Sequence, residues 1–366
     1  MSVPSRFAAR WRVVTACLLS LAALTACNPP HGPTPGEVRA RIARRIPAGV
    51  HDRAGWARDI QAALAVQKIA PTTDHVCAVL AVVEQESTYR ADPPVPGLPQ
   101  IARAEIHRRA AVLHVPQFVV DAALRVHAPD GTTYAEQLDR VRTEQDLSAL
   151  FEQMIDRVPL GRHLLAGLNP VHTAGPMQVS IAFAQSHARG YPYPVAGSIR
   201  QEVFSRRGGL YFGIAHLFGY PARYPRMLYR FADFNAGWYA SRNAAFQRAV
   251  AIASGSPLAQ DGDLLRPGAS LDAPGATEAA LRTLQPSLGM DAAAIRRDLQ
   301  ASDASAFEDT VLYRSVYALA EARAKAPLAR ARVPDITLHG PKLSRKLSTA
   351  WYASRVDARF QRCMRR

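Results

Sequence analysis

Apolar residues recur every three or four positions along most of this chain, and this spacing constrains the fold more than any other feature of the sequence. Such spacing is typical of helices that bury one face. Alanine, arginine, leucine and glutamate are frequent between the apolar positions, whereas the alternation expected of strands is scarce. We therefore predict a mainly α-helical protein whose helices are separated by loops rich in proline and glycine.

The first 26 residues have the pattern of an export signal. Three arginines and no acid precede an apolar run from Val13 to Leu24, which is too short to span a bilayer comfortably. The run ends in Leu24-Thr25-Ala26-Cys27, which resembles the lipobox of bacterial lipoproteins. That resemblance implies cleavage before Cys27 and lipidation of its thiol, with palmitate among the acyl groups. The alternative is an ordinary signal with a chance cysteine.

A lipid on Cys27 would attach the mature chain to a membrane. The next residue is Asn28 rather than aspartate, which by resemblance to sorting in enteric bacteria favours the outer membrane, with the protein facing the periplasm. Residues 27–50 begin with a proline-rich stretch that cannot pack into a core and is expected to act as a tether.

Cysteine usage and charge agree with export. Once the signal is removed and Cys27 is lipidated, only Cys77 and Cys363 remain, and two thiols in an oxidising compartment suggest one disulfide. Two buried free cysteines are the alternative. The net charge of +15 raises the question of nucleic acid, which export argues against. The sequence has no zinc-ligand spacing and no phosphate-binding loop, so we predict neither a metal nor a cofactor.

One acidic side chain is placed where burial can change its chemistry. Residues 72–87 are expected to form a helix with an apolar stripe, and Glu86 projects beside that stripe while Glu84 lies nearer its opposite edge. Burial disfavours the charged carboxylate and raises its pKa. A glutamic acid that is protonated near neutral pH can donate a proton to a glycosidic oxygen. A solvated glutamate at a helix end is the alternative.

Three short motifs, in this order, resemble those of the lysozyme-like lytic transglycosylases, which cut bacterial cell-wall glycan. The motifs are Glu84-Gln85-Glu86-Ser87, Gly175-Pro176-Met177-Gln178 and Phe234-Asn235-Ala236-Gly237. The resemblance implies that Glu86 is the catalytic acid and then the base. It also implies a substrate-binding set made of Ser87, Met177, Gln178, Phe234 and Asn235. No second carboxylate stands out, which suits this family, and Asp92 and Asp233 are the nearest candidates by sequence.

The second motif departs from the family pattern in position. Gln178 lies 92 residues beyond Glu86, which implies a large helical insertion at about 92–170. A competing motif, Gly97 to Ile101, lies closer to Glu86 but lacks the methionine, and we prefer the later one.

The third motif differs from the family pattern in the chemistry of one side chain. Phe234 stands where the family has a tyrosine whose hydroxyl contacts the catalytic acid, and phenylalanine cannot make that hydrogen bond. Tyr229 and Tyr239 are candidates to supply the hydroxyl.

These features divide the chain into four predicted parts. They are a signal peptide (1–26), an anchor and tether (27–50), a lysozyme-like helical domain with its insertion (51–253) and a C-terminal helical extension (254–366). A rise in glycine and proline between residues 254 and 274 marks the last boundary.

We predict a lytic transglycosylase-like lipoprotein that cleaves the bond between N-acetylmuramic acid and N-acetylglucosamine. Its expected partners are peptidoglycan strands and the membrane, not nucleic acid. The alternatives are a non-catalytic envelope protein that binds or scaffolds peptidoglycan, and a structural lipoprotein without affinity for glycan. The whole chain also resembles a family of proteobacterial lipoproteins, and that resemblance implies no particular activity.

Overall fold

The structure is a computed structural model that describes residues 32–338 and 346–366, and it is mainly helical. Its strands form two short antiparallel pairs, β1 (Thr173–Ala174) with β2 (Val179–Ser180) and β3 (Thr337–Leu338) with β4 (Leu347–Ser348). The prediction of a mainly α-helical fold is therefore confirmed. Within the described ranges, none of the helices combines the length and the apolar content that a membrane crossing needs. The predicted signal peptide and Cys27 lie outside these ranges.

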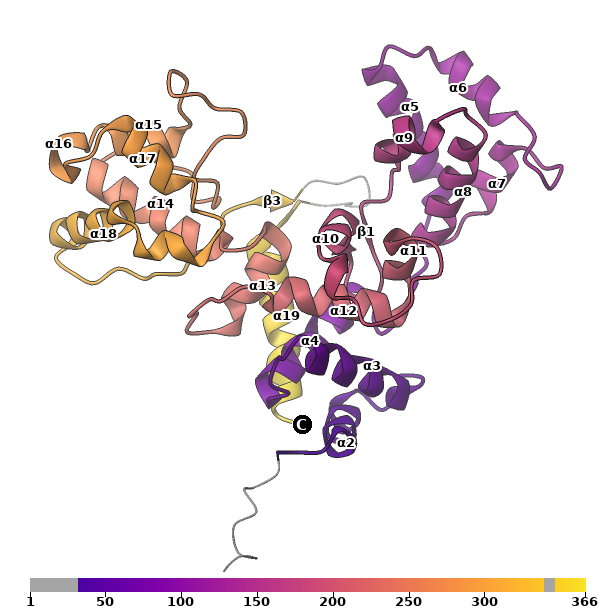
Figure 1. The fold of residues 1–366 in the computed structure, drawn as a ribbon, viewed down its shortest axis with the longest axis horizontal. Coiled ribbons are helices and arrows are strands. Elements are labelled where there is room, and N and C mark those ends of the chain that lie inside the picture. Colours follow the sequence, from indigo (N-terminus) through magenta and orange to yellow (C-terminus); the bar gives the residue numbers. More distant parts are fainter. Residues whose placement is uncertain (1–31, 339–345) are drawn as a thin grey trace, which may run out of the picture.

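One group of helices forms the central body of the molecule (Figure 1). Its members are α2 (Pro35–Arg45), α3 (Arg53–Val66), α4 (Thr73–Glu86), α10 (Ile181–Ser186), the 3-10 helix η2 (Ala188–Gly190), α11 (Ile199–Phe204), α12 (Arg206–Phe218), α13 (Met227–Ala236) and α19 (Thr349–Met364). α19 packs against both α4 and α13, while α3 packs against α2 and α12. The last helix of the chain thus lies against one of the first.

A second group forms a lobe beside the central body, drawn in purple and magenta in Figure 1. It contains α5 (Leu98–Val112), α6 (Gln117–Leu124), α7 (Tyr134–Arg140), α8 (Glu144–Asp156), α9 (Gly161–Leu165) and η1 (Ala166–Leu168). These helices lie within residues 92–170, the range of the predicted insertion. Its buried residues, such as Leu138 and Leu147, belong to the same apolar cluster as those of the central body.

A third group lies on the opposite side of the central body in Figure 1 and has an apolar cluster of its own. It contains α14 (Ala240–Ser254), α15 (Ala276–Arg282), α16 (Gln285–Leu288), α17 (Ala292–Leu299), η3 (Ser305–Asp309) and α18 (Val311–Ala324). Aromatic rings fill its centre, with Phe246 stacked on Tyr313 at 5.5 Å between ring centroids.

The groups of helices that pack together are not separated by the boundary predicted after residue 253. α14 precedes that boundary but packs against α18, whereas α19 follows it but packs in the central body. The predicted extension, 254–366, is therefore shared between two groups. The chain leaves the central body at α14 and returns to it at α19.

A disulfide joins Cys77 of α4 to Cys363 of α19, with the two Cα atoms 5.5 Å apart. This confirms the predicted pairing and rules out two free thiols. The two cysteines are 286 residues apart in the sequence, so the bond closes most of the described chain into one loop. It holds α19 against the helix that ends at Glu86.

Candidate functional site

Glu86 is the last residue of α4, a helix that runs through the middle of the central body. Thr72 caps the start of this helix, because its hydroxyl accepts a hydrogen bond from a backbone N–H three residues on. The residues from Val76 to Val83 are all buried, so neighbouring helices cover α4 on every side. Ser87 ends the helix, and its hydroxyl donates to the Val83 carbonyl oxygen at 3.0 Å. The Glu86 side chain therefore emerges where a buried helix stops.

The Glu86 carboxyl is shielded from solvent without being fully enclosed, since its side chain is half-buried. Burial raises the pKa of Glu86 to about 7. The Tyr352 hydroxyl and the Arg359 guanidinium oppose this shift, because both favour the charged carboxylate. Both protonation states of Glu86 are populated near neutral pH, which suits a group that donates a proton and then accepts one.

Tyr352 places an aromatic hydroxyl beside Glu86. This residue is buried on α19, and its hydroxyl lies within reach of the Glu86 carboxyl. The contact does not have the distance and angle of a well-formed hydrogen bond, and the hydroxyl has no other partner among the described residues. The buried side-chain oxygen of Gln85 is unpaired as well. The end of α4 thus carries polar groups that are desolvated but incompletely bonded.

Asn235 forms a hydrogen bond with the face of α19 that carries Tyr352. Its side-chain oxygen accepts a 2.8 Å hydrogen bond from the hydroxyl of Thr349. Thr349 and Tyr352 are three residues apart, so they lie on one face of the helix, separated by about 4.5 Å along its axis. Thr349, which binds Asn235, and Tyr352, which adjoins Glu86, therefore lie on a single turn of α19.

Phe234 has a packing role. Its ring lies against His216 of α12, with 4.9 Å between centroids, and its carbonyl oxygen accepts a 3.1 Å hydrogen bond from the imidazole Nε2. Tyr229 and Tyr239 were expected to supply the hydroxyl that Phe234 lacks, but neither is among the groups that act on the Glu86 carboxyl. Tyr239 donates instead to the Pro221 carbonyl oxygen.

The second motif forms the turn between β1 and β2. Gly175 has a φ of +74°, and a Cβ there would lie 2.2 Å from the Val203 carbonyl oxygen, so the turn requires glycine. Met177 is fully buried. The Gln178 side chain accepts a 3.1 Å hydrogen bond from the Thr173 hydroxyl and donates at 3.3 Å to the Gly175 carbonyl oxygen. Gln178 therefore stabilises the turn and does not present a free amide.

The competing motif has a different local role, since it begins α5 in the adjoining lobe. Gly97 caps that helix with a φ of +69°. Leu98 is buried, and Gln100 is exposed on the first turn. These residues start a helix outside the central body.

Asp233 and Asp92 were considered as a possible second catalytic carboxylate. Asp233 is fully buried and accepts hydrogen bonds from the hydroxyls of Tyr220 (2.9 Å) and Tyr224 (2.6 Å) and from the Ser241 backbone N–H (2.7 Å). Burial raises the pKa of Asp233 and also that of Asp92. In the part of the chain that the structure describes, no other carboxylate perturbs the pKa of Glu86, and no cluster of ligating side chains could hold a metal ion.

Comparisons with known proteins identify the family to which this chain belongs. The family model described as "Protein of unknown function (DUF1615)" matches residues 49–366. A protein of Escherichia coli (strain K12) described as "Uncharacterized protein YaiW" is 54% identical over 329 residues, which are 90% of this chain and 90% of that protein. No solved structure matches the chain.

Proposed function

The chain belongs to the DUF1615 family of proteins of unknown function, and we propose that it is a lytic transglycosylase-like protein of the bacterial cell envelope. It binds peptidoglycan strands and cleaves the bond between N-acetylmuramic acid and N-acetylglucosamine. The observation that carries this proposal is the convergence on one turn of α19, where Tyr352 adjoins Glu86 and Thr349 binds Asn235.

The arrangement of the three motifs in the central body supports this function. α4 is buried and ends at the acid, the turn between β1 and β2 carries the second motif, and α13 carries the third. α12 joins the last two, because Met177 packs on Gly213 of that helix and His216 contacts Phe234. The motifs that resemble those of the transglycosylases therefore lie in one helical body.

A single carboxyl group can carry out both halves of the reaction. Protonated Glu86 donates its proton to the glycosidic oxygen as the bond from the sugar carbon breaks, and the group becomes a carboxylate. That carboxylate then accepts the proton of a hydroxyl on the same sugar, and the hydroxyl oxygen attacks the positively charged carbon. The product is an anhydro sugar, and Glu86 is protonated again. A pKa of about 7 fits this cycle because neither form is strongly disfavoured near neutral pH.

We place the protein in the envelope as a lipoprotein of the outer membrane, held by lipid on Cys27. The sequence up to Cys27 supports this location, as does the disulfide between Cys77 and Cys363, since such bonds persist in oxidising compartments. Mass spectrometry of the mature protein is expected to find an N-terminal peptide that begins at Cys27 and carries acyl chains. An unmodified Cys27 within a longer peptide would remove the anchor from the proposal.

A second candidate function is non-catalytic binding of peptidoglycan. Two observations favour it: the side chains of Gln178 and Asn235 are already engaged in internal hydrogen bonds, and the disulfide holds α19 close to Glu86. A protein of this kind would retain affinity for glycan and position other envelope proteins on it.

Sedimentation and turbidity assays with purified sacculi distinguish between these two candidate functions. The proposed activity predicts that the wild-type protein sediments with sacculi and lowers their turbidity as soluble fragments are released. Sedimentation with unchanged turbidity would favour the binding protein. If the protein neither sediments with sacculi nor solubilises them, both functions fail and a structural lipoprotein remains.

A further inference from the structure

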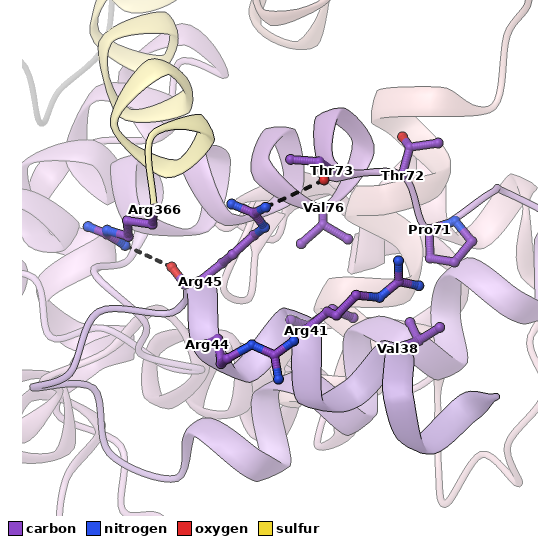
Figure 2. A pocket seen from close by; sticks show the side chains of 10 residues that line it. Val38, Arg41, Arg44, Arg45, Pro71, Thr72, Thr73, Val76 and Arg366 are labelled. Carbon is purple, nitrogen blue, oxygen red and sulfur yellow. Dashed lines mark hydrogen bonds between the residues drawn. The ribbon is translucent and has the colours of Figure 1, made fainter. Parts of the chain in front are cut away.

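A cavity of about 180 Å³ opens between α2 and the start of α4 (Figure 2). α2, which forms one wall of the cavity, is the first helix that the structure describes. The cavity is far larger than the roughly 15 Å³ that one water molecule needs. Its lining includes no acidic residue but contains Arg41, Arg44, Arg45 and Arg366.

Three of these arginines share one side of α2. At about 100° per residue, Arg41, Arg44 and Arg45 fall within an arc of about 100°, whereas Arg39 points to the opposite side. Figure 2 shows Arg41 and Arg45 extending from α2 toward the start of α4. The positive charge is therefore directed at the cavity and is not spread evenly around the helix.

The four arginines differ in the hydrogen bonds that their guanidinium groups make. Arg45 donates to a carbonyl oxygen near the end of α19 at 3.1 Å and to the Thr73 hydroxyl at 3.5 Å. Arg366 donates to the Arg45 carbonyl oxygen at 2.7 Å, and Figure 2 shows this guanidinium directed away from the cavity. Arg41 and Arg44 are exposed and donate no hydrogen bond to any described residue. The hydrogen-bond donors of these two guanidinium groups are thus available to a ligand.

The start of α4 adds to the positive character of the cavity, because the N-terminal end of a helix favours anions. Thr72 and Thr73 lie there and line the cavity. The nearest acids lie outside the lining and offset this charge only in part. Glu37 is engaged with Thr34 in the capping box of α2 and also attracts Arg41, one turn further along the helix, and Asp74 lies in the first turn of α4.

We propose that this cavity binds the phosphate of an anionic lipid headgroup and so seats the protein on a membrane surface. Guanidinium groups recognise phosphate through paired hydrogen bonds, and free arginines facing a cavity without acids fit that chemistry. The site is also close in sequence to the proposed anchor. Pro35 is eight residues after Cys27, so the connecting chain spans at most about 28 Å. This positional step depends on the proposed lipidation, and a basic contact would add to the lipid anchor.

Titration of the full-length mature protein in a neutral detergent tests the proposal. The wild-type protein is expected to bind short-chain phosphatidylglycerol and to bind zwitterionic phosphatidylcholine of the same chain length much more weakly. Arg41→Gln should weaken phosphatidylglycerol binding roughly fivefold, and Arg41→Gln with Arg44→Gln on the order of 20-fold, as expected for arginines near anionic lipid. Arg39→Gln is the matched control, with the same charge change on the other side of α2 and an expected loss below about twofold if the cavity is the site.

Four results would overturn the proposal. Equal losses for Arg39→Gln and Arg41→Gln would mean that diffuse charge, not the cavity, binds the lipid. Equal affinity for the two lipids, or inorganic phosphate binding as tightly as phosphatidylglycerol, would exclude a lipid headgroup as the specific ligand. No binding by the wild-type protein would exclude the site. The assay involves no glycan, so its failure leaves the proposed cleavage activity untouched.

Discussion

Replacement of Glu86 by glutamine is expected to lower the rate of sacculus solubilisation by roughly 10²- to 10⁴-fold, the range that a positioned acid and base typically supplies. Glutamine has nearly the same shape, but it cannot donate a carboxyl proton to the glycosidic oxygen or accept one afterwards. The measurement is the release of soluble muropeptides from purified sacculi. Circular dichroism and thermal unfolding of the variant establish that the fold is intact.

Glu84→Gln is the matched control for this variant. Glu84 lies on the last turn of the same helix and pairs with Arg362 at 2.9 Å and with Arg359 at 3.7 Å. Because it has no role in the proposed reaction, its loss should leave the rate within about threefold, as expected for a partly exposed ion pair. Unchanged solubilisation by Glu86→Gln, or an equal loss in both variants, would contradict the role assigned to Glu86.

The same Glu86→Gln variant allows a test that needs no substrate. The pKa of Glu86 is raised from 4.5 to about 7 in the folded protein, so between these values the folded state holds a proton that the unfolded state has lost. The stability contributed by this group is fully present below about pH 4.5 and is lost as the pH rises through 7. The free energy of unfolding of the wild type, relative to Glu86→Gln, should therefore fall by at most about 3 kcal/mol between pH 4 and pH 8. A difference that stays constant with pH would indicate an ordinary solvated carboxylate.

Loss of the disulfide between Cys77 and Cys363 is expected to lower the free energy of unfolding by about 5 kcal/mol. The bond closes a loop of 286 residues, and the loop-entropy model assigns long loops the largest stabilisation. Denaturant unfolding of a variant with both cysteines changed to serine measures this effect. Reducing agent should destabilise the wild type similarly and leave the variant unchanged. Equal midpoints for the oxidised wild type and the variant would contradict the prediction.

The disulfide also bears on the site. α19 carries Tyr352 and Thr349, so its detachment would separate both residues from α4 and α13. We therefore expect reduction to impair sacculus solubilisation at temperatures well below global unfolding.

Local pattern in the sequence was sufficient for part of the fold. The apolar spacing of residues 72–87 predicted the helix observed as α4 (Thr73–Glu86), whose bounds differ from the predicted ones by one residue at each end. Removal of the signal and the anchor left two cysteines, and these form the disulfide. Each of these inferences uses neighbouring residues or simple counting, which a single sequence contains.

The surroundings of Glu86 depend on contacts between distant segments. One apolar stripe was expected on α4, whereas the helix is buried on all sides because α19 covers a further face. Tyr352 lies 266 residues after Glu86, and nothing local to either residue encodes their proximity. The tail that ends at Cys363 was expected to contain a basic helix, and its sequence does not indicate which helix it covers.

Side-chain roles within the motifs were equally dependent on tertiary structure. Gln178 was expected to face the sugar, and in the folded chain it bonds to Thr173 and to the Gly175 carbonyl oxygen. A motif fixes which residue occupies a position, whereas the hydrogen bonds of that residue depend on which groups the fold brings near it.

The chemical nature of the released glycan ends tests the proposed reaction most directly. Mass spectrometry of fragments from sacculi treated with the wild-type protein should find muropeptides that end in anhydro sugars, and Glu86→Gln should release none above background. Fragments with ordinary reducing ends, or anhydro ends at undiminished yield from the variant, would contradict cleavage by Glu86 acting alone as acid and base.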